Sequence, residues 1–252
     1  MKTQVAQKQW PILATLARYR QLASRKIIDN MRGNQCLLCL QPAQSRCLCS
    51  GCLGDLPWQE RVCERCALPM PATSAAKQCF DCQSAPPRWQ SAQAVFHYQF
   101  PIDRLIAAFK YHHQLALTDL FAEFMAAKLQ PMPKHALMVP VPLHPDRLRA
   151  RGYDQTYLLA RAISRRSGLA CDATSLKRTR DTAMQKNLHR DDRLSNLQGA
   201  FSCSGQRLCH RPIVLVDDVM TTGATLSVIS DALLNQGAES VHTLVIARTL
   251  PA

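Results

Sequence analysis

One stretch near the carboxyl terminus decides the fold: residues 213–226 read IVLVDDVMTTGATL. The run from Ile213 to Val216 contains only β-branched residues and leucine, which predicts a strand buried on both faces of a sheet. Two adjacent carboxylates follow, and then a turn of small residues that opens a helix. Ligands of open α/β sheets bind beside the carboxyl ends of the strands. The sequence therefore places Asp217 and Asp218 at a ligand-binding edge.

The turn that follows the acids has the composition of a phosphate site. Backbone N–H groups from Thr221 to Thr225 can converge on one phosphate group, and the helix dipole adds partial positive charge. Gly223 allows the backbone to approach the anion closely. A phosphate site beside two acids suits a phosphorylated sugar, whereas an ordinary strand-to-helix turn capped by Thr and Asp is the ligand-free alternative. The candidate binding residues are Asp217, Asp218, Thr221, Thr222, Gly223, Ala224 and Thr225.

Strands and helices alternate around this stretch from about residue 91 onward. Strands separated by helices and buried on both faces predict a parallel, doubly wound α/β sheet flanked by helices. The expected strands are 93–98, 137–142, 213–216 and 241–247, and the expected helices are 101–112, 115–129, 154–167 and 223–236. We accordingly expect residues 91–252 to form one α/β domain.

A cysteine-rich module precedes this domain. Nine of the 12 cysteines lie between Cys36 and Cys82, and eight of them form four C-x2-C knuckles. Reduced cytosolic thiols at this spacing are typical of zinc ligands, and eight thiolates suffice for two tetrahedral sites. The expected ligands are Cys36, Cys39, Cys49, Cys52, Cys63, Cys66, Cys79 and Cys82. The spacing leaves sequential and cross-braced pairing open, and it also allows Cys47 to replace Cys49.

Length and composition bound the rest of the chain. With 252 residues, 47% hydrophobic, the chain can bury a core, and no apolar run approaches the roughly 20 residues needed to cross a bilayer. We expect a cytoplasmic protein without membrane insertion. Residues 1–35 carry seven Lys or Arg against one acid and read as a basic amphipathic helix. Residues 36–90 form the zinc module.

The net charge of +13 is concentrated in two places. Residues 144–193 hold twelve Lys or Arg against six acids, and the first 35 residues carry most of the remaining excess. A basic stretch beside a parallel sheet indicates an anionic ligand, either a polyphosphate or a nucleic acid.

The acidic pair followed by Thr-Thr-Gly-x-Thr resembles the signature by which type I phosphoribosyltransferases bind phosphoribosyl pyrophosphate (PRPP). The wider pattern resembles the ComF family, bacterial proteins that join a cysteine-rich module, here a double zinc ribbon, to such a domain. The resemblance covers about residues 36–250. Besides the knuckles and the acidic stretch, it rests on LIAAFKY at 105–111, VPVPLH at 139–144, RLRARGYDQ at 147–155, and Arg178, Arg180, Thr182, Gln185, Arg193, Asn196, Gly199 and Phe201.

The resemblance implies a type I phosphoribosyltransferase-like fold that binds PRPP with Mg²⁺. It places the pyrophosphate loop at 142–152, with Arg147 and Arg151, and the active-site loop near 177–193, with Arg178 and Arg180. The catalytic candidates are Asp217, Asp218, Arg178 and Arg180. Thr221 stands where purine-salvage members of the superfamily carry an Asp, which argues against a purine acceptor.

Two functions follow from this resemblance. The first is PRPP binding with transfer of phosphoribose to an unidentified acceptor, in a protein associated with DNA uptake and natural transformation. Its partners would be single-stranded DNA and the helicase and recombination proteins of uptake. The alternative is a non-catalytic competence or regulatory protein that retains the fold and meets nucleic acid through its basic segments.

Overall fold

The computed structural model describes residues 35–43, 47–180, 197 and 199–251. The chain divides into two units, one ending at Asp55 and the other beginning at Leu56. The smaller unit carries the short helix α2 (Ser50–Gly54). The basic helix expected in residues 1–35 lies outside the described residues, except for Gln35.

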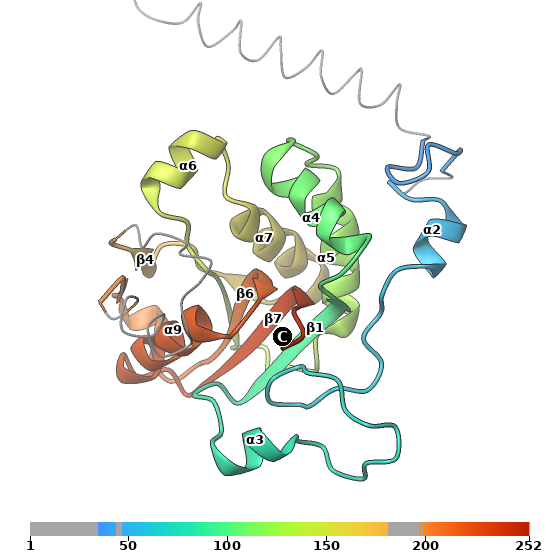
Figure 1. The fold of residues 1–252 in the computed structure, drawn as a ribbon. Coiled ribbons are helices and arrows are strands. Elements are labelled where there is room, and N and C mark those ends of the chain that lie inside the picture. The colour runs from blue at the N-terminus through green and yellow to red at the C-terminus, as the bar shows by residue number, and fades with distance from the viewer. Residues whose placement is uncertain (1–34, 44–46, 181–196, 198, 252) are drawn as a thin grey trace, which may run out of the picture. The chain divides into compact units, whose positions relative to one another are not determined.

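A five-stranded parallel sheet forms the centre of the larger unit (Figure 1). This sheet confirms the predicted α/β class. Its order is β1 (Ser91–His97), β7 (Ser240–Arg248), β6 (Pro212–Met220), β2 (Leu137–Pro140) and β3 (Ala170–Cys171).

Helices cover both faces of the sheet. Figure 1 shows α4 (Ile102–Tyr111), α5 (Leu117–Lys128) and α7 (Gln155–Ser167) on one face and α9 (Ala224–Asn235) on the other. Ile213 and Leu215 of β6 share a buried cluster with Leu226 and Ile229 of α9. Because successive side chains of a strand point to opposite faces, Asp217 lies on the α9 face and Asp218 on the face of α4 and α7.

Strand β6 is longer than its apolar run predicts. The sequence indicated residues 213–216, but pairing with β7 continues through the two acids, with Asp217 opposite Val245 and Met220 opposite Arg248. Backbone N–H and C=O groups form hydrogen bonds with the next strand whatever side chain the residue carries, so the strand continues beyond its apolar residues. The acids are therefore held by the sheet itself.

Several short elements were not predicted. Helix α6 (Pro145–Arg151) occupies the segment expected to be a loop. The ring of His144 accepts from the N–H of Asp146 at 3.3 Å, Pro145 starts the helix, and Gly152 ends it with φ of 81°. Strands β4 (Leu176–Arg178) and β5 (Phe201–Cys203) form a separate antiparallel pair. Helices α2 and α3 (Phe80–Ser84), strand β3 and the 3-10 turn η1 (Gln206–Leu208) were not predicted either.

The segment 57–64 runs along β1 and is bonded to it. Its backbone hydrogen bonds with β1 measure 2.8–2.9 Å. They run from the N–H of Gln59 to the carbonyl of Val95, from the N–H of His97 to the carbonyl of Pro57, and from the N–H of Ala92 to the carbonyl of Glu64. This segment leads directly into the second pair of cysteine knuckles.

Candidate functional site

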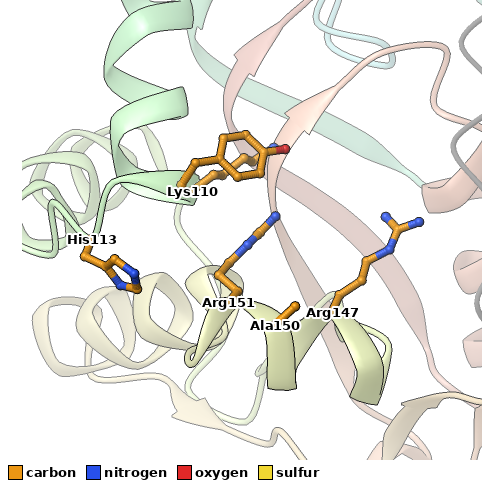
Figure 2. A pocket seen from close by; sticks show the side chains of 6 residues that line it. Lys110, His113, Arg147, Ala150 and Arg151 are labelled. Carbon is orange, nitrogen blue, oxygen red and sulfur yellow. The ribbon is translucent and has the colours of Figure 1, made fainter.

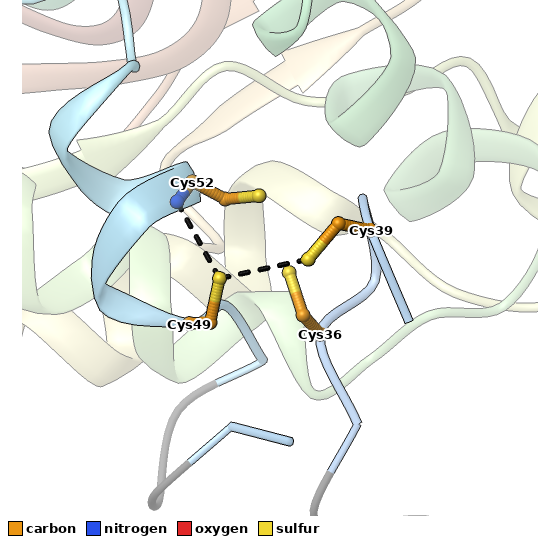
Figure 3. A group of neighbouring side chains, drawn as sticks. All are labelled: Cys36, Cys39, Cys49 and Cys52. Carbon is orange, nitrogen blue, oxygen red and sulfur yellow. Dashed lines mark hydrogen bonds between the residues drawn. The ribbon is translucent and has the colours of Figure 1, made fainter. Parts of the chain in front are cut away.

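The eight predicted cysteine ligands gather in two groups of four. Cys36, Cys39, Cys49 and Cys52 form the first group, in which all four Sγ atoms lie within 4.8 Å of one another (Figure 3). Cys63, Cys66, Cys79 and Cys82 form the second group on the same criterion. The knuckles therefore pair sequentially and not cross-braced, and Cys49 rather than Cys47 completes the first group.

Both groups fit zinc. In each, one Sγ–Sγ distance is 3.6 or 3.7 Å, from Cys39 to Cys49 and from Cys66 to Cys79. A tetrahedron with Zn–S bonds of about 2.3 Å has edges of about 3.8 Å. Four thiolates without an open position define a structural site, so the two groups are structural zinc sites.

Asp218 is already paired within the protein. Its carboxylate accepts from the Lys110 ammonium at 2.7 Å and from the Gln155 amide at 2.8 Å. Lys110 and Asp218 are mostly buried, with side chains 20% and 7% exposed. Burial favours the neutral amine of Lys110, but the charges of Asp218 and Asp217 prevail and raise the pKa of Lys110. Asp218 thus anchors α4 and α7 to the end of β6.

Asp217 has a different environment. Among the described residues, its carboxylate accepts only the backbone N–H of Asp218, at 2.8 Å. Loss of solvent, followed by the charge on Asp218, raises the pKa of Asp217 to about 8. Of the two predicted acids, Asp217 is therefore the one with acceptor capacity left for a ligand.

A cationic cavity of 360 Å³ adjoins Lys110. It is lined by Lys110, Tyr111, His113, Arg147, Ala150 and Arg151. Figure 2 shows Arg147 and Arg151 extending from the same face of α6. The Arg151 guanidinium lies over the Tyr111 ring at 5.1 Å and donates to the Gln155 side chain. One network therefore joins the cavity to Asp218 through Gln155.

The predicted phosphate turn starts α9. Gly223 is the residue before the helix, with φ of 79°, and the Thr222 hydroxyl accepts from the first N–H of the helix, that of Ala224, at 3.4 Å. A Cβ at Gly223 would lie 2.8 Å from the Trp89 ring and 3.1 Å from the Met220 side chain. Gly223 is therefore required by the protein's own packing as well as by its backbone conformation.

Arg178 ends strand β4, Arg180 lies two residues beyond it, and neither lines the cavity. The Arg178 guanidinium lies 5.6 Å from the centre of the Phe201 ring, and its Nε donates to the Arg180 carbonyl at 3.3 Å. Thr182, Gln185, Arg193 and Asn196 lie outside the described residues. The structure thus brings Arg147 and Arg151 together with Lys110 but leaves Arg178 and Arg180 outside this cavity.

Comparison with known proteins agrees with this architecture. Residues 27–83 match the double zinc ribbon domain and residues 207–250 the phosphoribosyl transferase domain. Competence protein F of Haemophilus influenzae is 32% identical over 80% of this chain and 90% of its own length. The chain belongs to the ComF family. The DNA utilization protein YhgH of Escherichia coli K12, also 32% identical, matches over 81% of this chain and 91% of its own. Among solved structures, a hypoxanthine phosphoribosyltransferase of Staphylococcus aureus is 13% identical, with a TM-score of 0.31, over 54% of this chain and 73% of its own.

Sequence reasoning missed two residues of this ComF-family site. Lys110 is the sixth residue of the LIAAFKY stretch and Gln155 ends RLRARGYDQ, yet neither was named as a partner of the acids. The sequence signal for Lys110 was a lysine on the buried side of a helix, because a buried ammonium needs a counter-charge.

In the described part of this ComF-family chain, no helix is long and apolar enough to span a membrane.

Proposed function

We propose that this protein binds PRPP with Mg²⁺ at the carboxyl edge of its sheet. The observation that carries the proposal is the continuous segment from β6 through the 221–223 turn into α9. It brings an acceptor carboxylate, Asp217, to the same face of the sheet as helix α9, which begins directly after Gly223. Carboxylates accept hydrogen bonds from ribose hydroxyls, and N–H groups at a helix start bind phosphate.

The cationic cavity supports the second half of the proposal. Lys110, Arg147 and Arg151 offer ammonium and guanidinium donors around one hollow. Pyrophosphate carries several negative charges and is bound well by such donors. We therefore assign the pyrophosphate of PRPP to this cavity.

The carboxylate of Asp217 suits a magnesium ion that is also bound by the substrate. Asp217 is the carboxylate with free acceptor capacity, because both oxygens of Asp218 accept from protein donors. Mg²⁺ is commonly held by one or two carboxylates while substrate phosphates and water complete its shell. When bound, the ion would neutralise charge on the pyrophosphate.

For the transfer step, we propose that pyrophosphate leaves C1 of the ribose and an acceptor nucleophile bonds there. The departing group accumulates negative charge, which preorganised donors stabilise. Lys110, Arg147 and Arg151 hold this charge, and we assign Arg178, at the end of β4, and Arg180, just beyond it, to supply further guanidinium groups. Asp217 orients the ribose through its hydroxyls.

The relatives indicate the cellular setting. They are named as a competence protein and a DNA utilization protein, which points to a role in handling incoming DNA. We propose that this protein works in the cytoplasm alongside single-stranded DNA and the helicase and recombination proteins of uptake. A non-catalytic role is the second candidate, favoured by the basic charge of +13, which suits direct contact with nucleic acid.

Calorimetric titration of the full chain with PRPP and Mg²⁺ tests binding. Asp217→Asn should weaken binding by at least about tenfold, since a charge-assisted hydrogen bond contributes about 1.5 to 3 kcal/mol. Asp119→Asn, an acid 74% exposed on α5, is the matched control and should bind as the parent does. Failure of the parent to bind refutes the proposal. Pyrophosphate release across nucleobases and nucleic acids then separates the transferase from the non-catalytic candidate.

A further inference from the structure

The second zinc ribbon is linked to the phosphate turn by buried side chains that contact both. Three consecutive carbonyls of its first knuckle, those of Glu64, Arg65 and Cys66, each accept a hydrogen bond from a residue that follows the last cysteine of the ribbon. The donors are the N–H of Ala92 at 2.9 Å, the indole N–H of Trp89 at 2.5 Å and the Nε of Arg248 at 3.0 Å. Zinc bound by both cysteines of the knuckle would hold it in this conformation and so fix the direction of these carbonyls.

Arg248 extends this contact to the phosphate turn. It ends strand β7 and is 6% exposed. While its Nε donates to Cys66, its Nη1 donates to the carbonyl of Met220 at 3.0 Å and also to that of Thr221. The carbonyl just before the phosphate turn and the carbonyl of its first residue, Thr221, are therefore bound by the same guanidinium group that bonds the zinc knuckle.

Trp89 makes a second connection. Its indole is 2% exposed and bonded to Arg65, whose guanidinium returns bonds of 2.8 Å to the carbonyls of Trp89 and Gln90. The far edge of the same ring fills the space beside Gly223, where a Cβ would lie only 2.8 Å away. Displacement of Trp89 would leave the turn without the wall against which it packs.

We propose that the second zinc knuckle is the support of the phosphate turn, with Arg248 and Trp89 as positioning residues. Zinc held by Cys63, Cys66, Cys79 and Cys82 then sets the affinity of the turn for phosphate. This rests on the proposed function, in which the turn binds the 5′-phosphate of PRPP. The zinc site affects ligand binding through the turn and does not contact the ligand.

Two conservative substitutions test the link in the zinc-loaded full chain. Arg248→Lys keeps the charge but loses the planar fork that bonds Cys66 and Met220 at once. Trp89→Phe removes both the indole donor and the edge of the ring that packs beside Gly223. The control is Arg166→Lys, because Arg166 bonds the exposed carboxylate of Asp119 at the surface.

The measurements are calorimetric affinity for PRPP with Mg²⁺, zinc content, and hydrogen exchange of the peptide covering residues 220–226. We expect both variants to keep two zinc ions, to bind at least about tenfold more weakly and to exchange at least about tenfold faster in that peptide only. The control should match the parent in all three measurements.

Removing the metal from one zinc site at a time tests the proposal independently. Cys79→Ser with Cys82→Ser should lower affinity and speed exchange in residues 220–226, as the Arg248 variant does. Cys36→Ser with Cys39→Ser removes a site of the same composition that supplies none of the contacts above, and it should leave both readouts unchanged.

The outcomes separate this proposal from the PRPP proposal. If the parent does not bind PRPP, the proposed function fails, and exchange alone decides whether the knuckle supports the turn. If exchange in residues 220–226 is unchanged in Arg248→Lys and in Trp89→Phe, the support proposal is wrong, whatever the parent binds. Equal effects of the two cysteine pairs would overturn it as well.

Discussion

Replacing Lys110 by Met should destabilise the larger unit strongly. The substitution keeps most of the apolar stem but removes the ammonium that lies 2.7 Å from Asp218. Asp218, 7% exposed, would then keep only the Gln155 amide as a side-chain donor. Leaving a buried charge without its counter-ion costs roughly 3 to 5 kcal/mol of the free energy of unfolding.

A double-mutant cycle isolates the pair. Asp218→Asn alone should also be costly, because the buried ammonium of Lys110 then loses the carboxylate that it bonds. The double variant buries no charge, and its Asn oxygen can still accept from Gln155. We therefore expect a coupling free energy of roughly 2 kcal/mol or more between the two positions, well above additivity.

Urea unfolding of the zinc-loaded protein, followed by circular dichroism, measures each corner of the cycle. Arg166→Met at the exposed pair with Asp119 is the control, since such surface pairs contribute at most about 1 kcal/mol. If the Lys110 and Asp218 changes simply add, or if Lys110→Met costs no more than the control, the buried pair does not hold α4 to β6 and our account of the site is wrong.

Three further predictions follow from the described sites. Metal analysis should find two zinc ions per chain, and Cys63→Ser with Cys66→Ser should remove one; a folded preparation without metal would contradict the assignment. Affinity for PRPP should rise with pH up to about 8 and level off above it, because hydroxyls donate to the ionised form of Asp217; calorimetry should show that the difference between the parent and Asp217→Asn vanishes at low pH. Binding to single-stranded DNA should be weak, independent of sequence and steeply lost with salt, as fluorescence anisotropy would show, and deletion of residues 1–34 should reduce it; tight binding at high salt would mean a base-reading surface that we have not described.

The sheet and the zinc ligands could be predicted because their signals are local. Apolar runs such as Ile213–Val216 mark strands that must be buried, and C-x2-C spacing marks a metal turn wherever it occurs. Which knuckles share a metal is decided by how the chain folds back, so the spacing alone left that choice open. The structure settles it by bringing Cys49 to Cys39.

The site was harder to predict where it depends on tertiary contacts. Two adjacent acids read alike in sequence, but the pleat sends Asp218 to Lys110 and leaves Asp217 on the other face. Helix α6 was missed because its segment is basic, has Pro142 and Pro145 on one side and ends at Gly152, a composition that is typical of a loop. Gly223 was chosen for its closeness to phosphate, whereas Trp89, distant in sequence, supplies an equally strong reason for glycine there.

The segment that precedes the second ribbon also bears on how the protein behaves in a crowded solution. Strand β1 ends the order of the sheet, and residues 57–64 bond along the side that would otherwise face water. An uncovered edge strand is a template on which another chain can add by backbone pairing. A protein shortened to begin at residue 91 would present that template and should self-associate. Because residues 57–64 cover this edge, the segment that enters the second zinc ribbon also protects the protein against aggregation.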